Sequence, residues 1–115
     1  MIKVYGIPNC NTVKKAISWL QQNGLSYEFH DYKKKGITKD KLQKWSKHCG
    51  WENILNKKGT TWAQLSDEQK AEISSENKAI DYLFENNSGI KRPVIEANGK
   101  YLIRFDEKQY EDVLL

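Results

Sequence analysis

The order of hydrophobic patterns along the chain predicts an α/β fold built on a mixed sheet. Three observations predict it: a strand–helix–strand pattern opens the chain, helical patterns alone fill the middle, and a hairpin followed by a helix closes it. A right-handed crossover makes the two opening strands parallel, whereas a tight hairpin pairs its strands antiparallel. The predicted order is therefore βαβ, helical block, ββα.

The opening unit is predicted from two changes of period. Ile2 to Tyr5 is short, β-branched and aromatic, which indicates a buried strand that ends in a loop. From Thr12 to Asn23 apolar residues recur at helical spacing, and Gly24 supplies a stop. Ser26 to Tyr32 alternates and is predicted as the second strand. The apolar face of the helix is expected to comprise Val13, Ala16, Ile17 and Leu20.

The middle of the chain carries helical signals. Lys33 to Gly36 indicates a solvated turn, after which Thr38 caps a helix that runs to His48. Asn56 to Thr61 is polar and is predicted to be irregular. A capping-box pattern at Ser66 then begins a helix that runs to about Ser74. Asn77 to Glu85 is predicted as a further helix whose apolar stripe consists of Ile80, Leu83 and Phe84. We interpret residues from about 37 to 87 as a helical insertion.

The last part returns to strand chemistry. Pro93 to Ala97 is short and apolar, Asn98-Gly99 is a strong two-residue hairpin signal, and Tyr101 to Arg104 follows as the returning strand. Asp106 then begins a final helix. Residues 1–34 and 88–115 are therefore expected to form the core of a single domain that spans residues 1–115.

Composition narrows the class of protein. A length of 115 residues with thirteen aromatic side chains is enough for one core without disulfide or metal staples. The two cysteines and two histidines show no metal-ligand spacing, so no metal site is predicted. Charges interrupt every apolar run and no signal peptide is visible, so a cytoplasmic protein without membrane contact is expected. A net charge of +4 fits a small anionic ligand as well as nucleic acid, and we do not predict nucleic-acid binding.

Cys10 is the candidate nucleophile because it lies between a strand-ending loop and a helix. The first amides of a helix have no intrahelical partners, and a thiolate there gains hydrogen bonds and favourable electrostatics. Asn11 and Thr12 can donate backbone hydrogen bonds, and Lys14 and Lys15 add positive charge. The alternative, that Cys10 is only a small residue at a helix start, stays open at this point.

The loop before the third strand supplies a possible partner for Cys10. In a βαβ…ββα topology this loop passes beside the start of the first helix, and here it reads Lys91-Arg92-Pro93. Arg92 would bring a permanent cation to a thiolate or an anionic substrate. The bond between Arg92 and Pro93 can be cis or trans.

Three segments together resemble the arsenate reductase (ArsC) family, and most closely its YffB/Spx-like branch: Tyr5 to Thr12, Leu55 to Trp62, and Ile90 to Pro93. The resemblance runs over essentially the whole chain. It implies a thioredoxin-like fold with a helical insertion and Cys10 as the catalytic nucleophile. It also implies no bound cofactor, a small anionic or thiol substrate, and glutathione or glutaredoxin as the partner that resolves the adduct.

The residues around the substrate are predicted in two ways. Asn11, Thr12 and Pro93 are candidates for substrate binding because of their place beside Cys10 in the predicted topology, where backbone amides can hold an oxyanion. By the resemblance, Arg92 and Arg104 match two of the three arginines that surround the anion in the arsenate reductases. The third arginine position is Asn56 here, where Lys57 or Lys58 could supply a point charge without the two-pronged grip of arginine, and Lys58 is the candidate. The favoured function is therefore a glutathione-dependent thiol reductase. Arsenate reductase proper is one alternative, and an Spx-like transcriptional regulator that binds RNA polymerase is the other.

Val13 occupies the position of a second cysteine in a CxxC motif. A dithiol mechanism within one loop is therefore excluded, and the simplest chemistry uses one protein thiol with glutathione as the second. Cys49 as a resolving thiol stays open as an alternative to a buried small residue. His30 is either a base or an ordinary strand residue, and the latter is preferred.

Overall fold

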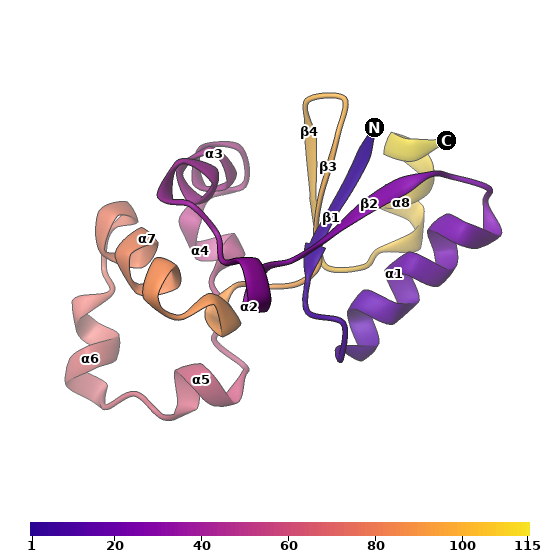
Figure 1. The fold of residues 1–115 in the computed structure, drawn as a ribbon. Helices are drawn as coiled ribbons and strands as arrows, with labels where there is room; N and C mark the ends of the chain where they lie inside the picture. Colours follow the sequence, from indigo (N-terminus) through magenta and orange to yellow (C-terminus); the bar gives the residue numbers. More distant parts are fainter. The chain divides into compact units, whose positions relative to one another are not determined.

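The computed structural model describes all 115 residues, and the chain divides into two compact units. The first unit comprises residues 1–35 and 92–115, and the second comprises residues 36–91. Figure 1 shows the strands gathered in the first unit and the run of short helices in the second. Cys10, the candidate nucleophile, belongs to the first unit, as do Tyr32 and Arg92.

A four-stranded mixed sheet forms the first unit. Its strands are β1 (Ile2–Gly6), β2 (Tyr27–Asp31), β3 (Val94–Ala97) and β4 (Lys100–Ile103), in the spatial order β2-β1-β3-β4. β1 pairs parallel with β2, whereas β3 pairs antiparallel with both β1 and β4. This confirms the predicted βαβ…ββα topology and the thioredoxin-like fold.

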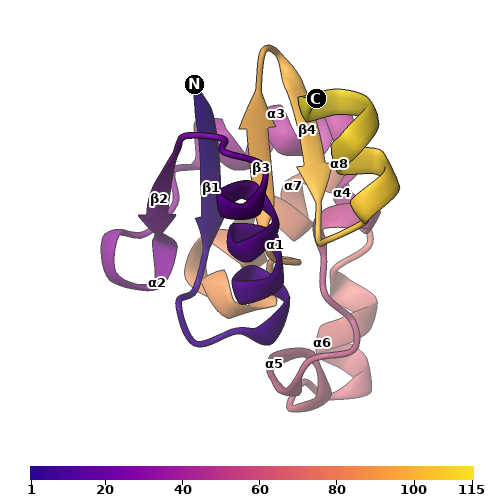
Figure 2. The ribbon, with the colours of Figure 1, turned by 90° about the vertical axis from the view of Figure 1, so that its right-hand side faces the viewer.

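Helices α1 (Asn11–Gln22) and α8 (Glu107–Leu114) cover one face of this sheet (Figure 2). Between them the ring of Tyr110 meets Trp19 and Phe105 edge-on, at centroid distances of 5.5 and 5.1 Å. The prediction of Ile17 as a core residue is wrong in part, because Ile17 is only half-buried while Trp19 is buried. The buried core of this face consists of Val4, Ala16, Trp19, Leu20, Ile95, Leu102 and Tyr110.

The hairpin between β3 and β4 turns as predicted at Asn98-Gly99. Both residues have positive φ angles, 52° and 76°, as the tight two-residue hairpin turn requires. The returning strand begins and ends one residue earlier than predicted, at Lys100 and Ile103; Arg104 adopts a φ of 67° and leaves the sheet. Its amide donates to the carbonyl of Pro93 at 2.8 Å, and the Tyr110 hydroxyl donates to the Arg104 carbonyl.

β2 ends earlier than predicted, at Asp31. The Asp31 carboxylate accepts hydrogen bonds from the amides of Lys33 and Lys34, at 3.1 and 3.3 Å. This side chain therefore begins a one-turn helix, α2 (Tyr32–Lys35), where a solvated turn was predicted. The three lysines of that turn are exposed, but Tyr32 is fully buried.

The second unit is entirely helical. Its elements are α3 (Lys39–Cys49), α4 (Trp51–Ile54), α5 (Thr60–Ala63), α6 (Asp67–Glu72), α7 (Glu76–Glu85) and the 3₁₀ turn η1 (Asn87–Gly89). α3, α4 and α7 pack on one another. Thr38 caps α3 by accepting a hydrogen bond from the Lys41 amide. The fully or nearly fully buried side chains of this unit include Leu42, Trp45, Ile54, Leu55, Ala79, Ile80, Leu83 and Ile90.

Two local predictions in this unit are wrong. Phe84 was predicted to be in the apolar stripe of α7, but it is 40% exposed and its ring lies 5.2 Å from the ammonium of Lys39, while Ala79 is buried instead. Ala79, Ile80 and Leu83 share one helix face, and Phe84 lies one residue beyond it. Thr60 to Ala63 forms α5, although the sequence around it was predicted to be irregular.

The boundary of the helical part also differs from the predicted residue 87. Residues 88–91, which were assigned to the core, lie in the helical unit. The amide of Lys91 donates to the carbonyl of Ile54, and the amide of Asn56 donates to the carbonyl of Gly89, both at 2.8 Å. These backbone hydrogen bonds tie the segment to the end of α4, so the unit boundary falls between Lys91 and Arg92.

None of the helices is both long enough and apolar enough to cross a lipid bilayer.

The predicted capping box at Ser66 is confirmed, and it provides a stability test. The Ser66 hydroxyl accepts from the Gln69 amide at 3.1 Å, while the Gln69 side chain accepts from the Ser66 amide at 2.8 Å. We expect Ser66→Ala to lower the free energy of unfolding by about 1 kcal/mol in urea denaturation. Ser18→Ala, at an exposed position within α1, is the control. A loss no larger than that of the control would contradict a capping role.

Candidate active site

Three strand ends meet at one edge of the sheet, and each carries a residue of the candidate site. The last residue of β1, Gly6, pairs with the last residue of β2, Asp31. The first residue of β3, Val94, pairs with Tyr5 beside them. The chain that leaves β1 reaches Cys10, the chain that leaves β2 reaches Tyr32, and the chain that enters β3 comes from Arg92.

The start of α1 is held close to β1 by a glycine. A Cβ atom added to Gly6 would lie 2.9 Å from Cγ2 of Val13, so only glycine allows this approach without a shift. Val13 is fully buried in the first turn of α1. The contact places Cys10 as the N-cap residue of α1, with an extended backbone and a partly exposed side chain.

The surroundings of Cys10 favour the thiolate. Burial is the largest single influence and acts to raise the pKa of the thiol, but the Val13 amide, the Arg92 side chain and the Thr12 amide together lower it below its ordinary value. The Cys10 side chain makes no capping hydrogen bond of the kind that a serine oxygen makes at the start of a helix. Thr12 and Val13 are the second and third residues of α1, and their amides are the donors that an N-cap side chain can reach. These amides stabilise the thiolate form of Cys10.

The sequence-based account of these donors was right for Thr12 and wrong for Asn11. Asn11 is the first helical residue, and the second amide is that of Val13. Of the cations predicted near Cys10, Arg92 lowers the pKa of its thiol.

Arg92 lies beside Cys10: by charge and by side-chain hydrogen bonding it lowers the pKa of the Cys10 thiol and opposes the rise in the pKa of Tyr32. The bond between Arg92 and Pro93 is cis. Pro93 is buried, and its carbonyl accepts the hydrogen bond from Arg104 described above. The predicted meeting of this loop with Cys10 is thus present, while the catalytic role of Arg92 and the substrate-binding role of Pro93 stay predictions.

Tyr32 is the residue that the sequence-based reasoning missed. It was treated as the end of the second strand, yet its side chain is fully buried and in contact with Arg92. Burial raises the pKa of Tyr32 to about 12, although Arg92 acts in the opposite direction. A signal was available, because parallel strands end at the same edge of a sheet and Tyr32 follows the second strand as the Cys10 loop follows the first.

Arg104 and Lys58 were also predicted as site residues. The side chain of Arg104 is exposed at the end of β4. Lys58 belongs to the helical unit, where its side chain is exposed and its amide donates to the Asn56 side chain at 3.1 Å. The substrate-binding roles of Asn11, Arg104 and Lys58 stay predictions.

Cys49 differs from Cys10 in its chemistry. It is the last residue of α3 in the helical unit, and burial raises the pKa of its thiol. Both cysteines are free thiols. His30 is half-buried on β2, with its ring 5.2 Å from that of Tyr5. No group of three or more His, Cys, Asp or Glu side chains is placed to hold a metal ion.

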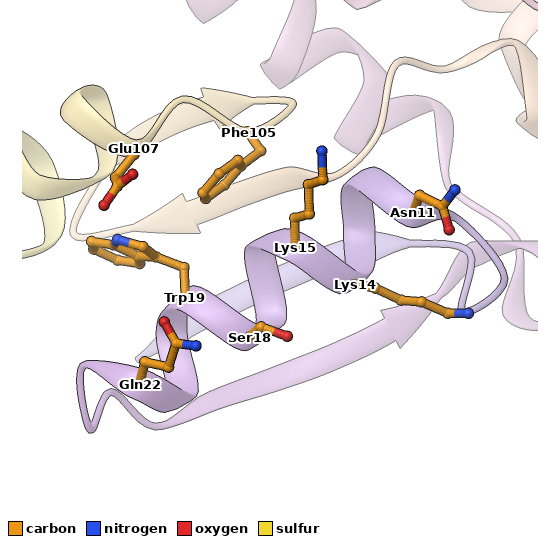
Figure 3. Close-up of a pocket in the computed structure, with 8 residues that line it drawn as sticks. All are labelled: Asn11, Lys14, Lys15, Ser18, Trp19, Gln22, Phe105 and Glu107. Carbon is orange, nitrogen blue, oxygen red and sulfur yellow. The ribbon is translucent and has the colours of Figure 1, made fainter.

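An open groove of about 550 Å³ runs along α1 from the end at which Cys10 lies. Figure 3 shows Asn11 and Lys14 near that end and Trp19 together with Glu107 at the other, with the Phe105 ring above the helix. The groove therefore offers amide and ammonium donors close to the first turn and an aromatic surface farther along.

Comparison with known proteins agrees with this geometry. The model of the ArsC family matches residues 5–113. An uncharacterised protein of Haemophilus influenzae is 43% identical over 111 residues, which are 96% of each chain. The transcriptional regulator Spx of Streptococcus mutans is 24% identical over 95% of this chain and 80% of its own.

Solved structures extend the comparison to the fold. The structure of a YffB protein has a TM-score of 0.95 and 41% identity over the whole of both chains. The solution structure of an arsenate reductase (ArsC) related protein from Brucella melitensis has a TM-score of 0.78 and 38% identity, covering 97% of this chain and 92% of its own. Since the family model spans nearly every residue that builds the sheet, the first helix and the Cys10 edge, the chain belongs to the ArsC family.

Proposed function

We propose that the protein is a thiol-dependent reductase in which Cys10 is the single nucleophile and glutathione or a glutaredoxin supplies the second thiol. The observation that carries the proposal is the contrast between the two cysteines. The pKa of Cys10 is lowered by helix amides and by Arg92, whereas burial raises the pKa of Cys49. Because the thiolate is the nucleophile in disulfide exchange, this contrast favours reaction at Cys10 alone.

The reaction needs no second protein thiol. The Cys10 thiolate attacks the glutathione sulfur of a mixed disulfide between glutathione and a substrate thiol. A bond forms between Cys10 and glutathione, the substrate sulfur leaves as a thiolate, and that thiolate takes up a proton. A second glutathione thiolate then attacks the bound glutathione sulfur, which releases Cys10 and oxidised glutathione. The substrate disulfide is reduced by two electrons, and two glutathione sulfurs are joined in its place.

Each residue has a part in this scheme. The amides of Thr12 and Val13 and the Arg92 side chain stabilise Cys10 as the attacking group and again as the leaving group. Asn11 follows Cys10 in the sequence, and Pro93 follows Arg92, which lies beside Cys10 in the fold. We assign both residues to substrate binding. Arg104 and Lys58 are proposed as cations for an anionic substrate, since both have exposed side chains.

Incubation with oxidised glutathione followed by intact-mass measurement and peptide mapping tests the proposal. We expect one adduct of one glutathione, located on the peptide that contains Cys10, with Cys49 unmodified. The adduct should disappear when reduced glutathione is added, because the second exchange step regenerates the thiol. An adduct on Cys49 alone, or no adduct, would refute the assignment.

A transcriptional role is the second candidate, and the similarity to Spx of Streptococcus mutans favours it. By that resemblance the chain would bind RNA polymerase. A CxxC redox switch is not available to it, because position 13 is a buried valine packed against Gly6. Pull-down of purified RNA polymerase with the tagged protein tests this candidate, and no retention above that of an unrelated protein of equal charge would remove it.

Arsenate reduction is less well supported. The position that matches the third arginine is Asn56, and its side chain serves the loop itself, because it accepts the Lys58 amide at 3.1 Å. A Cβ atom added to Gly59 would lie 2.9 Å from the Nδ2 atom of Asn56. The residue is therefore a turn former packed against its own loop, and it carries no charge for an arsenate oxyanion.

A further inference from the structure

The residue behind Arg92 suggests how the cation is kept in place. Cys10, Tyr32 and Arg92 adjoin the strand ends that meet at one edge of the sheet, and Tyr32 is fully buried there. The Arg92 side chain acts on both the Cys10 thiol and the Tyr32 hydroxyl by charge and hydrogen bonding. An arginine on a loop has several rotatable bonds, and a single contact with a partly exposed thiolate leaves much of that freedom. A second, buried anchor would reduce it before any substrate binds.

Tyr32 is suited to be that anchor because its own position is strongly determined. The preceding residue, Asp31, is paired with Gly6 in the sheet and also accepts the amides of Lys33 and Lys34. Tyr32 therefore stands at a junction where a strand ends and a short helix begins. Its side chain is fully buried.

The chemistry of the Tyr32 hydroxyl fits the same role. A guanidinium group has five N–H donors in a rigid plane and no acceptor, so it can donate to the Tyr32 oxygen and to the Cys10 sulfur at once. With its pKa raised to about 12 by burial, the hydroxyl remains neutral while the thiol ionises. Tyr32 thus holds the cation without cancelling its charge. The neighbouring carboxylate, Asp31, is occupied by the two amides of α2.

We propose that Tyr32 is a positioning residue that holds the Arg92 guanidinium against Cys10 and thereby helps to set the reactivity of the thiol. The proposal rests on the proposed function, in which Cys10 reacts as a thiolate. It goes beyond that function because it assigns Tyr32 a role that it exerts through Arg92.

The test measures the rate at which iodoacetamide alkylates Cys10 as a function of pH. A Cys49→Ser background leaves Cys10 as the only thiol. We expect Tyr32→Phe to move the midpoint of the profile to higher pH and to slow alkylation at neutral pH about two- to fivefold, the effect of losing one hydrogen bond. In an Arg92→Gln background the same change should have no further effect, since Tyr32 acts through Arg92.

Tyr110→Phe is the matched control. Tyr110 is the other fully buried tyrosine of the first unit, and its hydroxyl donates to the Arg104 carbonyl rather than to Arg92. This variant should be less stable but keep the wild-type midpoint. An unchanged midpoint in a folded Tyr32→Phe, or an equal shift with and without Arg92, would overturn the proposal. A wild-type midpoint at the ordinary thiol pKa would instead refute the proposed function.

A second measurement does not depend on the folding of Tyr32→Phe. In Cys10→Ser the thiolate is gone, but Tyr32 remains. The Nε atom of Arg92 is buried, so exchange of its hydrogen with water is not the readout. We expect the two terminal Nη groups of Arg92 in nuclear magnetic resonance spectra of this variant to give separate signals, because contact with Tyr32 slows the rotation of the guanidinium. A single averaged signal from a freely rotating guanidinium would show that Tyr32 does not hold it, and would overturn the proposal.

Discussion

Replacing Cys10 by serine is expected to lower the rate of reduction of a glutathione mixed disulfide by about a hundredfold or more. The serine hydroxyl is similar in size but does not ionise in the range where the thiol does, so neither the amides of Thr12 and Val13 nor Arg92 can make it a nucleophile. Glutathione release from a model mixed disulfide, followed by a coupled glutathione reductase assay, measures the rate.

Cys49→Ser is the matched control for this prediction. Burial raises the pKa of the Cys49 thiol, and the residue lies at the end of α3 in the helical unit. We expect this variant to keep the wild-type rate within about twofold, as for a substitution outside the reacting group. Equal losses in the two variants would point to a dithiol mechanism, and retention of activity by Cys10→Ser would exclude Cys10 as the nucleophile.

Replacing Arg92 by glutamine is expected to slow the reaction at neutral pH by about three- to tenfold. The glutamine amide can still donate a hydrogen bond, but it has no charge, so the thiolate loses both the electrostatic attraction and part of the hydrogen bonding that lower its pKa. The midpoint of the rate profile should move to higher pH. At alkaline pH the two rates should converge, because the thiol of either protein is then ionised.

The sign of this pH dependence follows from the direction of the shift. The pKa of Cys10 is lower in the folded protein than in an unfolded chain. The thiolate therefore contributes stability above the unfolded pKa, and this contribution is lost as the pH falls through the folded value. The wild-type protein should accordingly gain stability relative to Cys10→Ser as the pH rises from the pKa of Cys10 in the folded protein to its pKa in the unfolded chain. Arg92→Gln should diminish that gain, as urea denaturation at several pH values would measure.

Lys15→Gln is the control for charge as such. Lys15 is exposed on α1 within the groove, and the cation that acts on Cys10 is Arg92. The prediction for Arg92 would be contradicted if Lys15→Gln moved the midpoint as far as Arg92→Gln does, because the general positive charge of the region would then explain the shift.

Local sequence signals were sufficient for much of the secondary structure. The capping box at Ser66, the cap at Thr38 and the hairpin at Asn98-Gly99 are each decided by neighbours within a few residues, and all three are confirmed. The failures occur where the backbone departs from the local pattern. Arg104 leaves its predicted strand because its φ is 67°, although its amide still donates to the carbonyl of Pro93, the residue opposite it in the register of β3 and β4.

Burial was harder to predict than helix position. Trp19 is buried where Ile17 was expected, and Ala79 is buried where Phe84 was expected. The periodic pattern of a helix defines only a broad apolar stripe. The surface against which the helix packs decides which side of that stripe is covered. Residues 88–91 show the same limit. Their membership in the helical unit depends on hydrogen bonds to Ile54 and Asn56, which no local pattern reveals.

Local patterns were enough to predict the order of the elements, the place of Cys10 at the start of a helix, the lack of a second cysteine at position 13, the approach of Arg92 to the thiol and the resemblance to the family. Two features of the surroundings of the thiol came only from the folded structure: the Val13 amide acts on Cys10 beside that of Thr12, and Tyr32 lies close to Arg92. The groups that lie around the Cys10 thiol depend on the register of β1, β2 and β3, whose ends meet at one edge of the sheet. Strand register is a property of the assembled sheet and not of any one segment of the sequence.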